Sequence, residues 1–255
     1  MMDTRAFDIG MIGHVMPELL SYLDVTLLVA GISIVLGSAL GILLAWASLT
    51  GGRVLRYLAA GYVYVMRCTP SIVLLFIVFY GLPKLIEGVF HYNMNDMHRA
   101  VFAILAFSLL FGAYISEVFR AGYLAVPRGQ YEAAVSAGLS PMQTLIHVML
   151  GQAALIVLPN FGNAAVNLLK EASLAYTIGL IDLIGKGNLI IAQNFGAYGI
   201  EIYLACMMVY WAVVLLLEQI FAFIEGRLDT GMSLRGALPK KKERAAVRGG
   251  DAVGA

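Results

Sequence analysis

Residues 19–48 read LLSYLDVTLLVAGISIVLGSALGILLAWAS, a run in which Asp24 is the only charged residue. An α-helix needs about 20 apolar residues to cross the hydrocarbon core of a bilayer, so this run is long enough to span one. Further long apolar runs of the same kind follow along the chain, at residues 57–82, 100–123, 148–169 and 197–224. The pattern therefore predicts five transmembrane helices.

The composition supports this reading. Hydrophobic residues make up 60% of the 255 residues and charged residues 13%, whereas a soluble domain carries about 25% charged residues. A soluble globular protein is excluded because too few charges remain to cover its surface, and a disordered chain because it would be poor in apolar residues. The net charge of +1 gives no reason to expect a nucleic-acid partner. The predicted fold class is an all-α integral membrane protein, surrounded by membrane lipid.

The chain divides into three parts by charge and hydropathy. Residues 1–18 are expected to be an extracytoplasmic N-terminal segment, residues 19–226 the transmembrane domain, and residues 227–255 a basic, disordered cytoplasmic tail. Cytoplasmic loops carry an excess of Lys and Arg. The seven Lys and Arg of the tail decide the orientation, because the short loops alone give four on its side against five on the other. We therefore expect the N-terminus outside and the C-terminus in the cytoplasm.

The fourth run and its continuation carry an unusual polar face. At about 100° per residue, five polar or charged side chains fall within an arc of about 100° on one side of a helix. Such groups are costly at membrane depth and usually face a partner or an aqueous cavity. The stripe is therefore a candidate translocation pathway, with interhelical hydrogen bonding or an exit from the bilayer near Lys170 as the alternatives. Its members are Asn160, Asn163, Asn167, Lys170 and Glu171.

Two other features concern packing within the membrane. Gly37, Gly41 and Ala45 recur every four residues, which lets two helix backbones approach closely. We expect this stripe to pack within the chain rather than against a second copy. Pro70 removes a backbone donor and should kink the second run, while Arg67 either snorkels toward the cytoplasmic face or faces protein.

The loop between the third and fourth runs, about residues 125–147, is too polar to span but carries helix signals. Its central part, residues 126–143, reads VPRGQYEAAVSAGLSPMQ. Pro127 suits the start of a helix, Gly138 its end, and Ser140 with Gln143 the capped start of a second helix. The loop thus presents a short helix with a face of small residues to the cytoplasm, where it can seat in the groove of another protein.

This loop resembles the EAA loop of ABC-transporter permeases, whose Glu-Ala-Ala and following Gly correspond to Glu132, Ala133, Ala134 and Gly138. Four other stretches resemble the polar amino-acid uptake permeases of that class. They are residues 67–70 (RCTP), 80–83 (YGLP), 117–122 (EVFRAG) and 169–174 (LKEASL). The sequence departs from the family at Cys68, where Gly is usual, at Leu74, where Gln is common, and at Gly151, where Pro is usual.

The resemblance implies the five-helix core of the type I ABC-importer permease (MetI-like) fold in a bacterial inner membrane. It also implies the partners: two ATPase subunits that hold ATP and Mg, a second permease that is identical or related, and an extracytoplasmic solute-binding protein. By resemblance, Glu132, Ala133, Ala134 and Gly138 form the ATPase-coupling contact. The implied function is import of a polar amino acid by alternating access, with no cofactor or metal in this chain and no enzymatic activity of its own.

Other function classes fit this sequence less well. Residues 179–187 lack the spacing and the Ser or Thr of a phosphate-binding loop. The four scattered histidines give no nucleophile–base pair for a membrane enzyme. A self-sufficient ion-coupled carrier usually shows internal repeats, and none is visible. Within the importer class, residues 175–187 and 201–203 look most like cystine permeases, with opine, histidine, glutamine and arginine left open.

Overall fold

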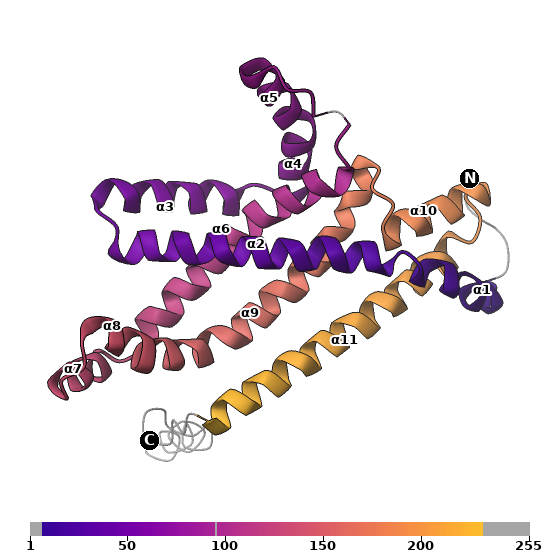
Figure 1. Ribbon diagram of the computed structural model, residues 1–255. Helices are drawn as coiled ribbons and strands as arrows, with labels where there is room; N and C mark the ends of the chain where they lie inside the picture. Colours follow the sequence, from indigo (N-terminus) through magenta and orange to yellow (C-terminus); the bar gives the residue numbers. More distant parts are fainter. Residues whose placement is uncertain (1–6, 95, 232–255) are drawn as a thin grey trace, which may run out of the picture.

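The structure is a computed structural model that describes residues 7–94 and 96–231. The described residues form helices joined by short turns (Figure 1). The helices are α1 Ile9–Leu20, α2 Leu23–Thr50, α3 Arg53–Cys68, α4 Ser71–Phe76, α5 Leu82–Phe90, α6 Arg99–Ala125, α7 Arg128–Ser136, α8 Pro141–Thr144, α9 Leu150–Ala172, α10 Leu183–Gln193 and α11 Gly199–Gly231. Two π-helical segments, η1 Ile77–Gly81 and η2 Leu145–Met149, and one 3₁₀ segment, η3 Ser173–Ile178, join some of them.

Five helical segments among the described residues are long and apolar enough to cross a membrane, which confirms the predicted all-α, five-span fold class. In Figure 1, α7 and α8 lie at one end of the bundle and α1 and α10 at the opposite end. We call these the α7 end and the α10 end. The five segments are Leu23–Thr50, Ser71–Phe90, Arg99–Ala125, Pro141–Ile178 and Gly199–Leu228.

The second span differs from the prediction. The sequence suggested one kinked helix over residues 57–82, but α3 ends at Cys68 and the spanning segment begins at Ser71. Thr69, which precedes proline, is extended with ψ of 125°, and Pro70 continues extended with ψ of 137°. Because two consecutive residues leave the helical region, Pro70 ends one helix and starts another rather than bending a single helix.

The contact between α2 and α6 is the scaffold of the bundle, and the two helices cross in Figure 1. A Cβ at Gly37 would lie 2.9 Å from the Ser108 carbonyl oxygen of α6, and one at Gly41 would overlap the Ile115 side chain. Ala45, the third member of this stripe, is buried. The small-residue stripe therefore packs within the chain, as expected, because only small side chains let the two backbones come this close.

Helix α9 lies between α6 and α11. Phe161 of α9 meets Phe111 of α6 and Phe221 of α11, with ring centroids 6.0 Å apart in both pairs. Gly162 leaves room for the Phe221 ring, which would lie 3.1 Å from a Cβ at that position. One face of α9 is thus packed by aromatic contacts, and this packing fixes the rotation of the helix and the direction of its polar face.

The α10 end has its own small apolar core, formed by α1, α10 and α11 around Val15, Leu183 and Ile202. Lys186 of α10 pairs with Glu18 of α1 at 2.6 Å, and Glu201 of α11 accepts a bond of 3.0 Å from the Asp8 backbone N–H. The described part of the predicted N-terminal segment therefore includes a docked helix. The predicted basic tail lies outside the described residues from residue 232 onward.

Candidate functional site

The polar face of α9 lines an open pocket of about 580 Å³ between α9 and α6. All five side chains of the predicted stripe contribute to it, and η3 continues the chain beyond them toward the α10 end. The wall on the α6 side is apolar except for one hydroxyl. The stripe residues are Asn160, Asn163, Asn167, Lys170 and Glu171, and the α6 residues are Leu110, Phe111, Tyr114 and Val118.

Four of the five stripe side chains are exposed in the single chain, and Glu171 is half-buried. The Asn160 amide donates to the Ile156 carbonyl of its own helix at 3.3 Å. Among the described residues, no stripe side chain makes a hydrogen bond or ion pair to another helix. The interhelical-bonding alternative therefore finds no support within the chain, and the polar groups face outward from the bundle.

The α6 wall of the pocket was not identified from the sequence. Leu110, Tyr114 and Val118 are spaced four residues apart, so they lie on one face of α6 opposite the polar stripe. That spacing was visible in the sequence, but it does not distinguish a pocket wall from an ordinary packing face. The three residues are recognised as a pocket wall only because the structure places this face of α6 across from the polar stripe of α9.

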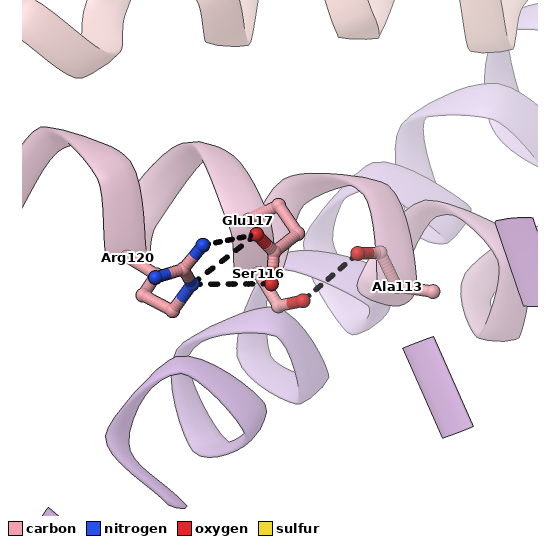
Figure 2. A network of polar contacts seen from close by, with 4 residues as sticks. All are labelled: Ala113, Ser116, Glu117 and Arg120. Carbon is pink, nitrogen blue, oxygen red and sulfur yellow. Dashed lines mark hydrogen bonds and ion pairs between the residues drawn. The ribbon is translucent and has the colours of Figure 1, made fainter. Parts of the chain in front are cut away.

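The EVFRAG stretch of α6 contains an ion pair, which Figure 2 shows from close by. The Arg120 guanidinium donates to the Glu117 carboxylate, with Nη2 and Oε2 2.7 Å apart. The preceding Ser116 is buried and donates to the Ala113 carbonyl at 2.8 Å. Pairing at i and i+3 neutralises two charges locally within a spanning helix, so this arginine is matched inside the chain.

The predicted coupling loop forms the two short helices expected at the α7 end. Helix α7 is followed by Gly138 with φ of 89°, a left-handed conformation that ends the helix. The Ser140 side chain accepts from the Gln143 N–H and the Gln143 side chain accepts from the Ser140 N–H, so both halves of a capping box are present. The local sequence signals predicted these boundaries.

The four residues predicted to couple to an ATPase do not all face outward. Glu132, Ala133 and Gly138 are exposed, whereas Ala134 is buried with 8% of its surface accessible. Glu132 also lines a smaller pocket of about 320 Å³ beside Tyr131. Helix α7 therefore leaves one face exposed and uses Ala134 to pack on the chain itself.

A direct polar contact joins the predicted coupling loop to the helix of the stripe. The Gln152 amide of α9 donates to the Gln130 side-chain oxygen of α7 at 3.2 Å. The π-helical segment η2, between α8 and α9, lies in the same connection. Helix α7 and the helix that lines the pocket are therefore in direct contact.

The described residues were also compared with the requirements of a metal site. Within residues 7–94 and 96–231, no three His, Cys, Asp or Glu side chains gather in a way that could hold a metal ion. The structure combines helices long enough to span a membrane, a polar pocket on the surface of the helix bundle, and two short helices joined by a turn at one end. These features are those of a multi-span membrane protein with a polar pocket among its helices, as a transport protein requires.

Known proteins identify the family. The chain belongs to the family described as "Binding-protein-dependent transport system inner membrane component", which matches residues 11–230. It is 38% identical over 224 residues to the L-cystine transport system permease protein TcyL of Bacillus subtilis (strain 168), covering 88% of this chain and 92% of that protein. It is 30% identical over 240 residues to the nopaline transport system permease protein NocM of Agrobacterium fabrum, covering 92% and 99%.

Solved structures agree with this assignment. A structure titled "Crystal structure of an amino acid ABC transporter with histidines" aligns with a TM-score of 0.76 at 26% identity, covering 88% of this chain and all of that one. The MetNI methionine ABC transporter in an inward-facing conformation aligns with a TM-score of 0.61 at 18% identity, covering 87% and 99%, which shows a shared fold.

The resemblance to polar amino-acid ABC permeases and the type I importer fold are thereby confirmed. The chain is the multi-pass inner-membrane component of its transport system, and the ATPase is a separate subunit. A permease of this family works with an ATPase and with a binding protein. The self-sufficient ion-coupled carrier considered from the sequence is therefore set aside.

Proposed function

We propose that this chain is the permease subunit of an importer for a polar amino acid, and that the α9 stripe lines the translocation pathway. The observation that carries the proposal is the pocket in which Lys170 and Glu171 lie beside Asn160, Asn163 and Asn167. A cation and an anion on adjacent residues match the two charges of a zwitterion. The asparagine amides supply further donors and acceptors along the face.

The exposure of the stripe supports a second permease chain. Polar and charged side chains that face lipid at membrane depth are costly, so a partner must cover the face on which Asn163, Asn167 and Lys170 are exposed. A second copy or a related permease, with its own polar face, would enclose an aqueous path between the two chains. Alternating access then follows from a change in how the two chains pack.

The substrate class rests on charge and on the named relatives. Relatives of this chain are described as L-cystine and nopaline permeases, and both names denote amino-acid-like solutes. We propose L-cystine as the substrate, because the TcyL and TcyB cystine permeases are 38% and 36% identical to this chain. An opine or another small polar amino acid is the competing choice.

Coupling to ATP hydrolysis is proposed at α7. Its exposed Glu132, Ala133 and Gly138 would seat on an ATPase, while Ala134 holds α7 against the rest of the chain. Two ATPases, each binding ATP and Mg, would serve the two permeases. Closure of the ATPases would move α7, and the contact between Gln130 and Gln152 would pass this movement to α9.

The orientation follows from the same assignment. If α7 meets a cytoplasmic ATPase, the α7 end is cytoplasmic and the α10 end, with the N-terminal segment 1–18, faces the solute-binding protein. The transmembrane domain is then 19–226, and the basic tail 227–255 is cytoplasmic. This agrees with the excess of Lys and Arg in the tail.

Reconstitution tests the transport function. The permease, the ATPase and the solute-binding protein that act with it are placed in proteoliposomes. Uptake of labelled L-cystine, labelled nopaline and labelled L-glutamine is followed separately, and each unlabelled solute is tested as a competitor of the others. ATP-dependent uptake of L-cystine that excess nopaline does not compete away is the expected result. Uptake of none of the three solutes would contradict the amino-acid assignment, and preference for nopaline would replace cystine by an opine.

A charge reversal tests the coupling surface. Glu132→Arg places a cation on the exposed face of α7 and should abolish ATPase docking and uptake together, measured by co-purification and by proteoliposome transport. Glu87→Arg on α5 reverses a carboxylate away from α7 and serves as the matched control. Unchanged docking in Glu132→Arg would remove α7 from the coupling contact.

A further inference from the structure

The turn between α10 and α11 exposes one aromatic side chain completely. Phe195 has 101% of its surface accessible, the largest fraction among the exposed apolar side chains of the described residues. The turn lies near the tip of the α10 end, away from α7 and α8 (Figure 1). Single exposed apolar residues are common on protein surfaces, so exposure alone does not make a site. Phe195 is distinguished by its backbone conformation.

Phe195 occupies the left-handed position that follows the end of α10, where glycine is the usual residue. The Gly196 N–H donates to the Ile191 carbonyl at 2.9 Å. The Phe195 N–H donates to the Ala192 carbonyl at 3.0 Å, and the two bonds together form a Schellman motif. Phe195 has φ of 55°. This conformation is strained for a bulky residue, because the Cβ comes too close to the following carbonyl oxygen.

Tyr198, in the same turn, shows how such strain can be offset. It has φ of 61°, and its side chain packs against the apolar core of the α10 end. Phe195 makes no such packing contact with the described residues, since its side chain is fully exposed. Packing within the chain therefore does not offset the strain at Phe195. Strained residues persist at binding sites, where the fixed conformation serves a contact.

The surroundings of Phe195 favour a protein partner over the membrane. Segments that anchor in a bilayer surface combine aromatic side chains with Lys or Arg, and residues 187–200 contain neither cation. The neighbours of Phe195 in the turn are polar or small instead, namely Gln193, Asn194 and Gly196. Lipid accepts an apolar side chain in any conformation. One rigidly held ring with a polar rim is typical of an anchor that fills a pocket on another protein.

We infer that Phe195 is the anchor by which the solute-binding protein docks on this permease, its ring entering an apolar pocket of that protein. A permease of this family works with a binding protein. The α10 end is the extracytoplasmic end if α7 meets the ATPase, so the inference rests on the proposed function and orientation. The strained turn holds the ring outward before the partner arrives, and less conformational freedom is then lost on docking.

The test uses residues that fit the left-handed conformation but lack the ring. Phe195→Gly and Phe195→Asn both suit this backbone position. Surface plasmon resonance measures the affinity of the solute-binding protein, unliganded and loaded with L-cystine, for the permease–ATPase complex in nanodiscs. Both variants should weaken binding by about 10-fold or more, while their thermal stability is no lower than that of the wild type. Phe195→Trp keeps an aromatic ring and should bind within about threefold of the wild type.

The matched control is Phe223→Ala. Phe223 is also an exposed phenylalanine, 62% accessible, and lies toward the other end of α11. This variant should not change the affinity. Unchanged affinity in Phe195→Gly and Phe195→Asn would overturn the inference, as would an equal loss in Phe223→Ala. Loss of the second permease from the Phe195 variants, seen by native mass spectrometry, would place the ring between the two permeases and would also overturn it.

Phe195→Trp, made together with Trp46→Phe and Trp211→Phe, distinguishes a protein partner from the membrane by fluorescence. Acrylamide should quench its emission, brominated phospholipid in the nanodisc should not, and the solute-binding protein should protect it from acrylamide. Quenching by brominated phospholipid would overturn the inference in favour of a membrane contact.

The proposed function and the docking contact fail in different ways. Normal amino-acid uptake by the wild-type system, with unchanged affinity in the Phe195 variants, would remove the docking contact alone. Uptake of none of the amino acids by the wild-type system would contradict the proposed function itself, and the inference would fall with it.

Discussion

Two helix surfaces of this molecule differ in packing and polarity: the contact between α2 and α6, and the polar face of α9. The α2–α6 contact is closely packed, and glycines bring its backbones together: a Cβ at Gly37 would lie 2.9 Å from a backbone oxygen of α6. The face of α9 is polar and leaves a pocket of about 580 Å³. The first buries surface that never needs to open. The second keeps costly polar groups exposed, which makes sense if another chain and a solute meet it.

The largest expected effect on stability comes from adding a larger side chain to the closely packed α2–α6 contact. Gly41→Val adds a Cβ that overlaps the Ile115 side chain and also approaches the Gly112 carbonyl at 3.2 Å. Overpacking typically costs about 1–3 kcal/mol, and here the backbone must also move, so folded yield and thermal stability in detergent should both fall. Gly61→Val on α3 is the control, because a Cβ there meets nothing within 4 Å. Equal stability of the two variants would contradict the scaffold role.

The next effect comes from the polar face and should leave the fold intact. Lys170→Ala removes an exposed cation from the pocket, so uptake should fall by roughly 10–150-fold, the equivalent of about 1.5–3 kcal/mol for a charge-assisted hydrogen bond. ATPase docking and thermal stability should not change. Kinetics of uptake in proteoliposomes measure the effect. Uptake at the wild-type rate would make Lys170 a structural residue.

Asn163→Leu is a second variant that distinguishes an effect on stability from an effect on transport. The side chain is exposed and makes no hydrogen bond to another part of the described chain, so its loss should cost the single chain no stability. Uptake should nevertheless fall, by an amount smaller than in Lys170→Ala, because a neutral amide contributes less than a charge. Reduced thermal stability with normal uptake would make Asn163 a structural residue and not a residue of the pathway.

The smallest effect on transport concerns a buried polar group outside the spanning segments. Burial raises the pKa of Asp182 to about 6, although its carboxylate accepts from the Gly185 N–H and caps α10. A raised pKa means that the folded state favours the protonated acid. Its contribution to stability is therefore present below about pH 4 and is lost as the pH rises through about 6.

Asp182→Asn keeps a capping side chain but removes the ionisation. Its thermal stability should vary less between pH 4 and 7 than that of the wild type, and at pH 7 it should be no lower, while uptake is unchanged. An identical pH dependence in wild type and variant would show that another group titrates in this range. Loss of uptake would instead indicate that Asp182 contributes to the transport pathway.

Much of the difference between the α2–α6 contact and the polar face of α9 was predictable from the sequence. The spacing of Gly37, Gly41 and Ala45 indicated a close helix contact, and the 100° geometry of a helix placed the five polar residues of α9 on one side. Local signals also fixed the ends of α7 and the capping box at Ser140. These features depend on residues within one helix or turn, so periodicity and propensity capture them.

What the sequence could not give depends on pairing between helices. The second span was predicted over residues 57–82, because hydropathy averages over the break that Pro70 makes between α3 and α4. The pocket forms between α6 and α9, and the contact of Arg67 with Tyr114 joins residues 47 positions apart. No local pattern in the sequence encodes the register of such helix pairs. The inward position of Ala134 likewise depends on how α7 packs on the chain.

Water accessibility of the α9 face tests the central claim most directly. Asn163→Cys is made in a background without Cys68 and Cys206, assembled with its partners in membranes, and treated with a charged, water-soluble thiol reagent. Leu43→Cys on α2, whose side chain is 62% exposed in the single chain, provides the lipid-facing comparison. If the stripe is the pathway, Asn163→Cys is modified much faster than Leu43→Cys and substrate protects it. If both react equally slowly, the polar face is a dry contact between chains.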